Sequence, residues 1–387
     1  MTNYAQLLSQ HAVQLQRVGT GLVNGPISDG LSEALKAAKA ALEAGGDITS
    51  YVALSRSVSL VESAVKSPTE TSWAEVTREL EQLADYEANW AAKLFTTPEA
   101  AMVAPASSVV LSYVDKSLMT LAGGQRVDSG LWSDYVSGME QSTVKAYSGA
   151  VKAGYANGES ISQIAARFKT ISDGLLRREA EALARTGVQH YAQAATEAMY
   201  QANKDVIKKM IYFATLDNRT TSLCAGRDGS KWDIDDQKRP PLPAHWGCRS
   251  RYIPETRGMT GLEGTRTATG GEDGEEAADE FAKRESNLQK RRDNPNITGE
   301  TSSKVRYRGR KDAKIFDVSK VKATTEYESF FLDQPAWWQD SVFGPTRAKL
   351  VRSGGMKISQ FNDMTGRQLT LKELRELDAE AFRRAGL

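Results

Sequence analysis

Leu175–Asp205 reads LLRREAEALARTGVQHYAQAATEAMYQANKD, and this stretch decides the fold class. Its apolar and small residues recur at helical spacing with few breaks. Helices of this length that are rich in small residues are typical of an elongated α-domain. We therefore predict that this part of the chain is one of several long helices.

The hydrophobic period changes after about Lys209. Met210–Leu216 is a short apolar run rich in β-forming residues, turn residues follow it, and Gly229–Ile234 is a candidate for a second short strand. We predict a compact β-containing module, closed by a proline loop, that is docked on the preceding helices.

The residues before this stretch also favour helices. Leu31–Leu42 has helical spacing and ends at two glycines, and Ser72 with Glu75, like Ser160 with Gln163, has the spacing of a capping box. The predicted fold is mainly α with a small α+β module. Residues 1–155 form an N-terminal helical region and residues 156–255 form the compact module.

The chain after the module divides into two parts. Residues 256–303 are rich in glycine and charge and bury too little apolar area to fold, so we predict a linker. Residues 304–387 regain helical and aromatic patterns, with Thr370 and Glu373 as a capping box. Four of these C-terminal residues are predicted to anchor an interface with a partner: Trp337, Trp338, Phe343 and Arg347.

Composition excludes several classes of protein. The chain has 387 residues, a formal net charge of +1 and two cysteines, Cys224 and Cys248. A disulfide scaffold is excluded and a reduced compartment is expected. The sequence shows neither a signal-peptide pattern nor a run of about 20 apolar residues, so we expect a soluble or assembly-bound protein without a membrane partner.

Cys224, His245 and Cys248 have the spacing C-x20-H-x2-C. A tight turn brings the two ligands of H-x-x-C toward one ion, and Cys224 is a candidate third ligand for zinc; His190 is the nearest further histidine. The alternative is that both cysteines are small buried side chains and His245 holds the loop by hydrogen bonds. We favour the alternative, and so expect no cofactor.

Arg185 lies among small residues of the predicted helix, where a guanidinium needs an acidic partner if it is buried. Asp217 is the candidate, which predicts an Arg–Asp clamp between helix and module. A metal-dependent nuclease is the enzyme alternative. Its candidate ligands are Asp217, Asp228, Asp233, Asp235 and Asp236. Phosphate-loop, dinucleotide and G-x-S-x-G motifs are absent, so we expect no enzyme.

The order of these motifs resembles the head-morphogenesis domain of tailed-bacteriophage minor head proteins, the Mu F-like group. The family pattern is a helix with A-R-T, a strand ending in D-x-R-T, a cysteine, a D-G turn and a closing P-P-x-H-x-x-C-R-[CS]. Matching positions are Arg185, Thr186, Asp217, Arg219, Thr220, Cys224, Asp228, Gly229, His245, Cys248 and Arg249. Thr221 and Ser250 stand where many relatives have further cysteines. Phe331–Leu374 resembles the tail segment of the same group.

The resemblance implies a minor head protein present in few copies, bound to the portal vertex inside the capsid and needed for assembly. It implies the portal protein and a major capsid or scaffolding protein as partners, host cytoplasm during assembly, and no established catalysis. Some relatives associate with DNA or are delivered with it. A DNA-binding module is the other rival, with five candidate phosphate contacts: Lys304, Arg306, Arg308, Arg310 and Lys311.

Overall fold

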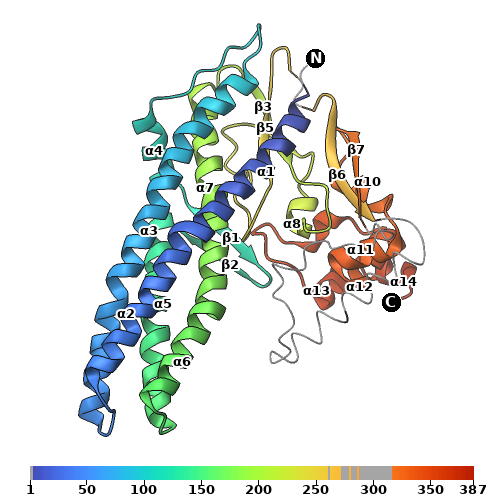
Figure 1. The fold of residues 1–387 in the computed structure, drawn as a ribbon. Helices are drawn as coiled ribbons and strands as arrows, with labels where there is room; N and C mark the ends of the chain where they lie inside the picture. The colour runs from blue at the N-terminus through green and yellow to red at the C-terminus, as the bar shows by residue number, and fades with distance from the viewer. Residues whose placement is uncertain (1–2, 260–261, 272–278, 280–285, 287–315) are drawn as a thin grey trace. The chain divides into compact units, whose positions relative to one another are not determined.

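The computed structural model describes residues 3–259, 262–271, 279, 286 and 316–387 (Figure 1). The predicted fold class is confirmed, because the described chain is mostly helical with small sheets. It divides into two compact units, and each is built from separated segments. Unit 1 comprises Met1–Ser9, Ile211–Lys231 and Gly261–Leu387, whereas unit 2 comprises Gln10–Met210 and Trp232–Thr260.

Long helices dominate unit 2, and α2, α3, α5 and α7 run alongside one another in Figure 1. Two single π-helical turns, Val23–Ile27 and Ser172–Leu176, join helices that continue one another. The helices are α1 (Tyr4–Leu22, which begins in unit 1), α2 (Ser28–Gly45), α3 (Tyr51–Phe95), α4 (Ser107–Lys116), α5 (Trp132–Ala156), α6 (Ile161–Ile171) and α7 (Arg177–Ala202).

Small residues let these helices approach closely. A Cβ added at Gly30 of α2 would lie 2.3 Å from the Cβ of Ser72 in α3, and one added at Gly187 of α7 would lie 2.6 Å from the Trp132 ring of α5. The prediction that Ser72 caps a helix is wrong, because α3 runs through it. Its buried hydroxyl instead donates to the Pro26 carbonyl at 2.7 Å.

The other two predicted capping boxes are confirmed. Ser160 begins α6 and its backbone N–H donates to Gln163 Oε1 at 2.8 Å, while its hydroxyl accepts from the Gln163 N–H. Thr370 and Glu373 form the same reciprocal pair at the start of α13 (Leu371–Leu377). Both boxes satisfy backbone donors that a helix start leaves without partners.

The strands form three small sheets. In unit 2, β1 (Met119–Gly123) pairs antiparallel with β2 (Arg126–Gly130), with Leu121 opposite Asp128. The second sheet has the order β4-β3-β5, from Lys231–Trp232, Ile207–Phe213 and Arg251–Thr256, and the boundary between the units passes through β3. In unit 1, β6 (Thr265–Gly271) pairs antiparallel with β7 (Phe316–Lys322). Strands β3 and β4 fall where the change of period predicts strands.

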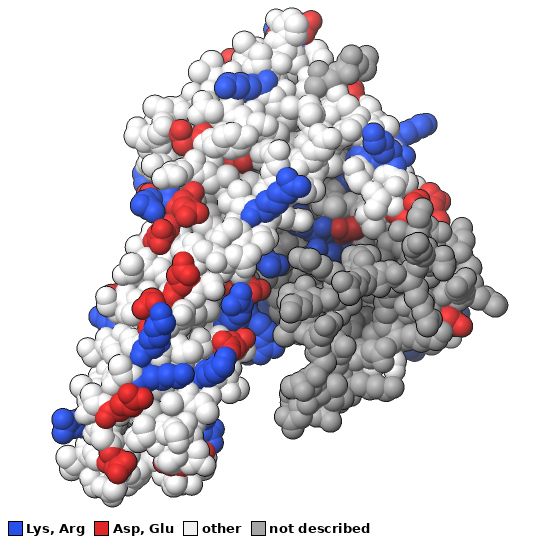
Figure 2. Space-filling view, viewed as in Figure 1, with Lys and Arg blue, Asp and Glu red and all other residues white. Residues whose placement is uncertain are grey.

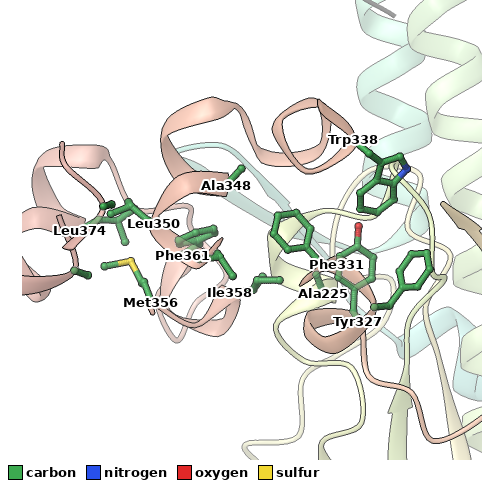
Figure 3. Packing of buried hydrophobic residues seen from close by; sticks show 14 of the residues in the cluster. Ala225, Tyr327, Phe331, Trp338, Ala348, Leu350, Met356, Ile358, Phe361 and Leu374 are labelled. Carbon is green, nitrogen blue, oxygen red and sulfur yellow. The ribbon is translucent and has the colours of Figure 1, made fainter. Parts of the chain in front are cut away.

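Short helices in unit 1 enclose an aromatic core (Figure 3). Tyr327, Phe331 and Trp338 are fully buried, and the Phe330 and Trp338 rings meet edge to face at 5.6 Å. The helices are α8 (Ser222–Ala225), α10 (Tyr327–Leu332), α11 (Ala336–Phe343), α12 (Pro345–Arg352), a 3₁₀ turn (Ile358–Phe361), α13 and α14 (Ala379–Arg384).

Strand β6 lies inside the predicted linker, so that prediction is wrong for Thr265–Gly271. Alternate residues of β6 face inward, and Arg266 is buried because its Nη1 lies 3.0 Å from Asp228 Oδ2. Asp228 also accepts the Ala214 N–H at 2.7 Å and the Tyr327 N–H at 2.9 Å. The buried ion pair of Asp228 and Arg266 and its further hydrogen bonds stabilise β6 in the fold. The glycine-rich composition of this stretch gave no indication of such an ion pair.

Figure 2 shows Lys and Arg interspersed with Asp and Glu along the long helices on the face in view. Several are spaced to pair on one helix, as Lys66 and Glu70 do. Within the described part of the chain, none of the helices combines the length and the apolar character that crossing a membrane requires.

Candidate functional site

A segment of unit 2, Arg239–Ile253, which runs through a loop into the first residues of β5, is held along one face of α7; we call it the clamp loop. Its three contacts on α7 are seven residues apart, which is close to two helical turns, so they share a face. The hydrogen bonds are Gly247 N–H to Thr186 Oγ1 at 3.1 Å, Gln193 Nε2–H to the Ser250 carbonyl at 3.0 Å and Tyr200 O–H to the Tyr252 carbonyl at 3.0 Å.

An ion pair fixes the start of the clamp loop. Arg239 reaches Glu197 of α7 with two parallel hydrogen bonds of 2.9 and 2.5 Å, and the side chains are 12% and 17% exposed. The guanidinium lies 4.9 Å from the centre of the Tyr252 ring, and the Tyr252 hydroxyl donates to the Pro240 carbonyl at 2.8 Å. A bidentate ion pair that is largely shielded from solvent is stronger and more directional than an ion pair on the surface.

The middle of the clamp loop is a tight turn. The Cys248 N–H donates to the His245 carbonyl at 3.1 Å, and Gly247 has φ of +67°, a conformation that suits glycine. His245 Nδ1 lies 2.9 Å from the Trp246 carbonyl. One ligand atom of His245 and the Cys248 sulfur lie within 4.8 Å of each other. The peptide bond before Pro243 is cis.

Cys224, the third residue of the predicted zinc set, belongs to unit 1. It is buried in α8, with its sulfur 3.2 Å from the Tyr212 hydroxyl, and Thr221 caps this short helix. Thr221 thus has a structural task at the place where many relatives of the resembled group have a cysteine. The three-residue zinc set stays a prediction.

Arg185 corrects one expectation. It is not buried: its side chain is 52% exposed and lies 3.8 Å from Glu181, one turn back on α7. The small residues around it do face the core, but the position of Arg185 on the helix points it outward. The reason for a clamp with Asp217 is therefore lost, and Thr186, one residue on, makes the contact with the clamp loop instead.

The D-x-R-T segment of unit 1 forms a local turn. Asp217 Oδ1 accepts the Arg219 N–H at 3.0 Å and the Thr220 hydroxyl at 3.2 Å, and the same hydroxyl donates to the Thr215 carbonyl. Thr220 is buried, Arg219 is exposed and Arg249 of the clamp loop is half-buried. Aspartate commonly holds a turn in this way.

The remaining acidic candidates have structural partners. Asp233 lies 2.8 Å from Lys209, Asp235 lies 3.5 Å from Lys204, and Asp236 accepts the Lys238 N–H in a turn. Asp228 is sequestered in its ion pair with Arg266. These contacts favour turns and ion pairs over a nuclease centre for each residue.

The predicted C-terminal interface is wrong for Trp338, which is fully buried in the core of its own unit. Trp337 and Phe343 pack at the edge of that core, and Arg347 donates to the Leu369 carbonyl at 2.7 Å. Their part in a partner interface stays a prediction. The basic stretch, Lys304, Arg306, Arg308, Arg310 and Lys311, lies outside the described residues.

A groove of about 1000 Å³ borders the clamp loop in unit 2. Helix α4, the face of α7 around Glu197 and the prolines at 240 and 241 form its walls. Val109 and Leu118 line it and are 54% and 55% exposed. Tyr113 also lines it, and burial raises the pKa of its hydroxyl. The groove combines apolar and hydrogen-bonding groups, as binding sites commonly do.

Sequence reasoning missed most residues that hold the clamp loop: Gln193, Glu197, Tyr200 and Arg239. A signal was present, because the three α7 residues follow one another at helical spacing of four and three among alanines. The sequence could not reveal the partners of Gln193 and Tyr200, because these are backbone carbonyls of the loop, whereas Glu197 pairs with the distant side chain of Arg239.

Residues 147–253 match the model of one protein family, described as phage Mu protein F like protein. The match begins in α5, includes α7 and β3, and ends in the last residue of the clamp loop. No curated protein and no solved structure matches the chain.

Proposed function

We propose that this chain is a minor head protein that binds the portal vertex inside the capsid, because residues 147–253 match the model of the phage Mu protein F-like family, a family of phage head morphogenesis proteins. Proteins of this family are generally structural proteins of the phage head, so the expected partners are other proteins of capsid assembly. The family match over the helix and its clamp loop is the observation that carries the proposal.

The contacts between the clamp loop and α7 support a role in binding a partner protein rather than in catalysis. Three hydrogen bonds and a bidentate ion pair hold the loop against α7, so the walls of the adjacent groove are pre-ordered. A pre-ordered surface loses little entropy when a partner binds. We propose that the portal protein contacts the groove at Val109 and Leu118, which offer apolar side chains to a partner.

The test is co-assembly with the portal and major capsid proteins of the same phage. The chain should sediment with proheads that contain portal and not with shells assembled without it. Leu118→Asp should reduce this association, because a charge in an apolar contact is costly. Val52→Asp is the control, since Val52 is 78% exposed in unit 2 and lies outside the groove residues. Equal sedimentation with portal-free shells would contradict the proposal.

Contact with DNA is a separate part of the proposal. It depends on the predicted phosphate contacts at residues 304–311, so binding should weaken with salt by about 0.9 log unit per contact for each log unit of salt. Fluorescence anisotropy of labelled duplex, with the five basic residues changed to glutamine, measures it. A salt slope that the glutamine variant leaves unchanged would remove DNA as a partner of this stretch.

A further inference from the structure

The helices α2, α3, α5 and α7 of unit 2 each have an interruption or a weak point at about one level of the bundle. The π-helical turn before α2, Val23–Ile27, contains Pro26 and a glycine, Gly25, with non-helical backbone angles (φ −98°, ψ −110°). The π-helical turn before α7, Ser172–Leu176, has Gly174 at its centre. Helices kink at prolines and at π-helical turns, so both turns are places where the bundle can bend.

Helices α3 and α5 run on without a break but carry weak points. Pro68 lies inside α3, where its missing N–H leaves the carbonyl four residues earlier without its helical hydrogen bond. The next residue, Thr69, donates its hydroxyl to the Val65 carbonyl at 2.7 Å. Thr143 of α5 makes the same contact with the Met139 carbonyl at 2.9 Å. Side-chain bonds of this kind slightly destabilise a helix and often bend it.

Contacts place these features next to one another. The Ser72 hydroxyl of α3 donates to the Pro26 carbonyl at 2.7 Å, and a Cβ added at Gly30 of α2 would lie 3.6 Å from the Pro68 carbonyl. A small cavity of about 10 Å³ lies here, and residues of all four helices line it: Gly30, Thr69, Thr143 and Ala180. Ala180 is about one turn beyond the second π-helical turn. A void at this level removes packing that would otherwise oppose bending.

The helices beyond this level have a core of their own, and we call them the distal arm. The distal arm consists of α2, residues 51–67 of α3, residues 144–156 of α5, and α6, which lie together at the lower end of the bundle in Figure 1. The Tyr147 and Phe168 rings meet edge to face at 5.2 Å. Six apolar residues of the arm are fully buried: Leu42, Val61, Val65, Val151, Ile164 and Phe168. A segment that keeps its own core can move as one body.

We propose that the bundle bends at the level of Pro68 and Gly174, which we call the hinge, so that the distal arm swings relative to the rest of unit 2. Ser162 of α6 is twelve residues from Gly174, which is about 18 Å along a helix. A bend of about 20° moves Ser162 by about 6 Å. This motion lets the arm follow the surface of a partner, and it does not depend on what the groove binds.

Double electron–electron resonance on the full chain tests the proposal. Spin labels on introduced p-acetylphenylalanine leave Cys224 and Cys248 unmodified. One label pair, Gln82 and Ser162, straddles the hinge, whereas a control pair, Arg56 and Ser162, lies within the distal arm; all three positions are exposed. The straddling pair should give a distance distribution about 6 Å wider than that of the control pair.

A variant that repairs the helices should remove most of this extra width. Pro68→Ala restores a backbone N–H to α3, and Gly174→Ala stiffens the π-helical turn, where the added Cβ has nothing within 4 Å. Gly149→Ala is the matched control, because it lies in α5 inside the distal arm with equally open space, and it should leave the width unchanged. Both changes at the hinge favour helix, so thermal melting of the double variant should be no lower than that of the native chain.

Two results would overturn the proposal. Equal widths for the two label pairs in the native chain would show that the bundle is rigid at this level. An extra width that persists in the folded double variant, or that Gly149→Ala removes equally well, would show that the motion does not arise at Pro68 and Gly174.

Discussion

Replacing Arg266 by methionine should cost unit 1 about 3–5 kcal/mol of folding free energy, because it leaves a buried carboxylate without its counter-ion. Arg266 and Asp228 are 3% and 0% exposed, and their closest atoms are 3.0 Å apart. After the change, the hydrogen bonds that Asp228 keeps within the described part of the chain are those from the N–H groups of Ala214 and Tyr327. Urea unfolding, followed with hydrogen exchange of the β6 amides to isolate this unit, measures the loss.

The loss should depend on pH. Burial raises the pKa of Asp228, and the opposing attraction of Arg266 limits that rise. Without Arg266 the pKa should rise further above its unfolded value. A carboxyl with a raised folded pKa destabilises the fold as pH increases, so the deficit of Arg266→Met should be largest near pH 7 and shrink as pH falls toward 4.

Two further variants sharpen this test. Adding Asp228→Asn to Arg266→Met removes the stranded charge, so the double variant should be more stable at pH 7 than Arg266→Met alone. Arg78→Met is the control, because Arg78 is 64% exposed in its pair with Glu75 and should change stability by less than about 0.5 kcal/mol. A cost below about 1 kcal/mol for Arg266→Met, or an equal cost at pH 4 and pH 7, would refute the reasoning.

Three other outcomes are expected. Trp338→Ala should lower the folding free energy of unit 1 by about 3–5 kcal/mol, because it opens a cavity at a fully buried site. Urea unfolding measures this loss, and a loss near zero would contradict the burial of Trp338. Gly187→Ala should destabilise unit 2, because the added Cβ would clash with the Trp132 ring. Gly138→Ala in α5 has open space around the added Cβ and should stabilise the protein by up to about 1 kcal/mol. Thermal melts that rank the two variants in the opposite order would contradict this prediction. Stability should fall as pH decreases from about 6.5 to about 4, because the unfolded chain binds a proton on His190 before the folded chain does. The full difference is about 3 kcal/mol, and the same fall in His190→Leu would exclude this origin.

Local signals in the sequence predicted local structure well. Ser160 and Thr370 begin helices as expected, because a capping box is complete within four residues. Ser72 has the same pattern but lies inside a 45-residue helix, where its hydroxyl bonds a carbonyl of another segment. The spacing of a capping box shows that a serine could cap a helix, but the same hydroxyl can instead bond a segment that is distant in sequence.

Features that depend on a distant partner could not be predicted. Arg266 lies in a glycine- and threonine-rich stretch, and only the acceptors gathered around it, Asp228 above all, make burial of that strand favourable. Arg185 was expected to be buried because its neighbours are small, but it points outward, and the next residue on the helix, Thr186, contacts the loop instead. For the candidate site, the loop, its histidine–cysteine turn and Thr186 of the helix could be predicted, whereas the other helix residues that hold the loop, Gln193, Glu197 and Tyr200, could not.

The segment order of unit 1 has a consequence for synthesis. Asn3 accepts the N–H of Thr265 through its side-chain oxygen and donates to the Thr265 hydroxyl, and Leu216 and Ala225 pack into a core that is completed by Phe382 and Ala385. Synthesis must therefore reach Phe382 and Ala385 before this core can be completed, long after Gln10–Met210 of unit 2 have been made. A stop codon shortly before Tyr327 would leave residues 211–231 without their core partners, even though the family-matched region had been made in full.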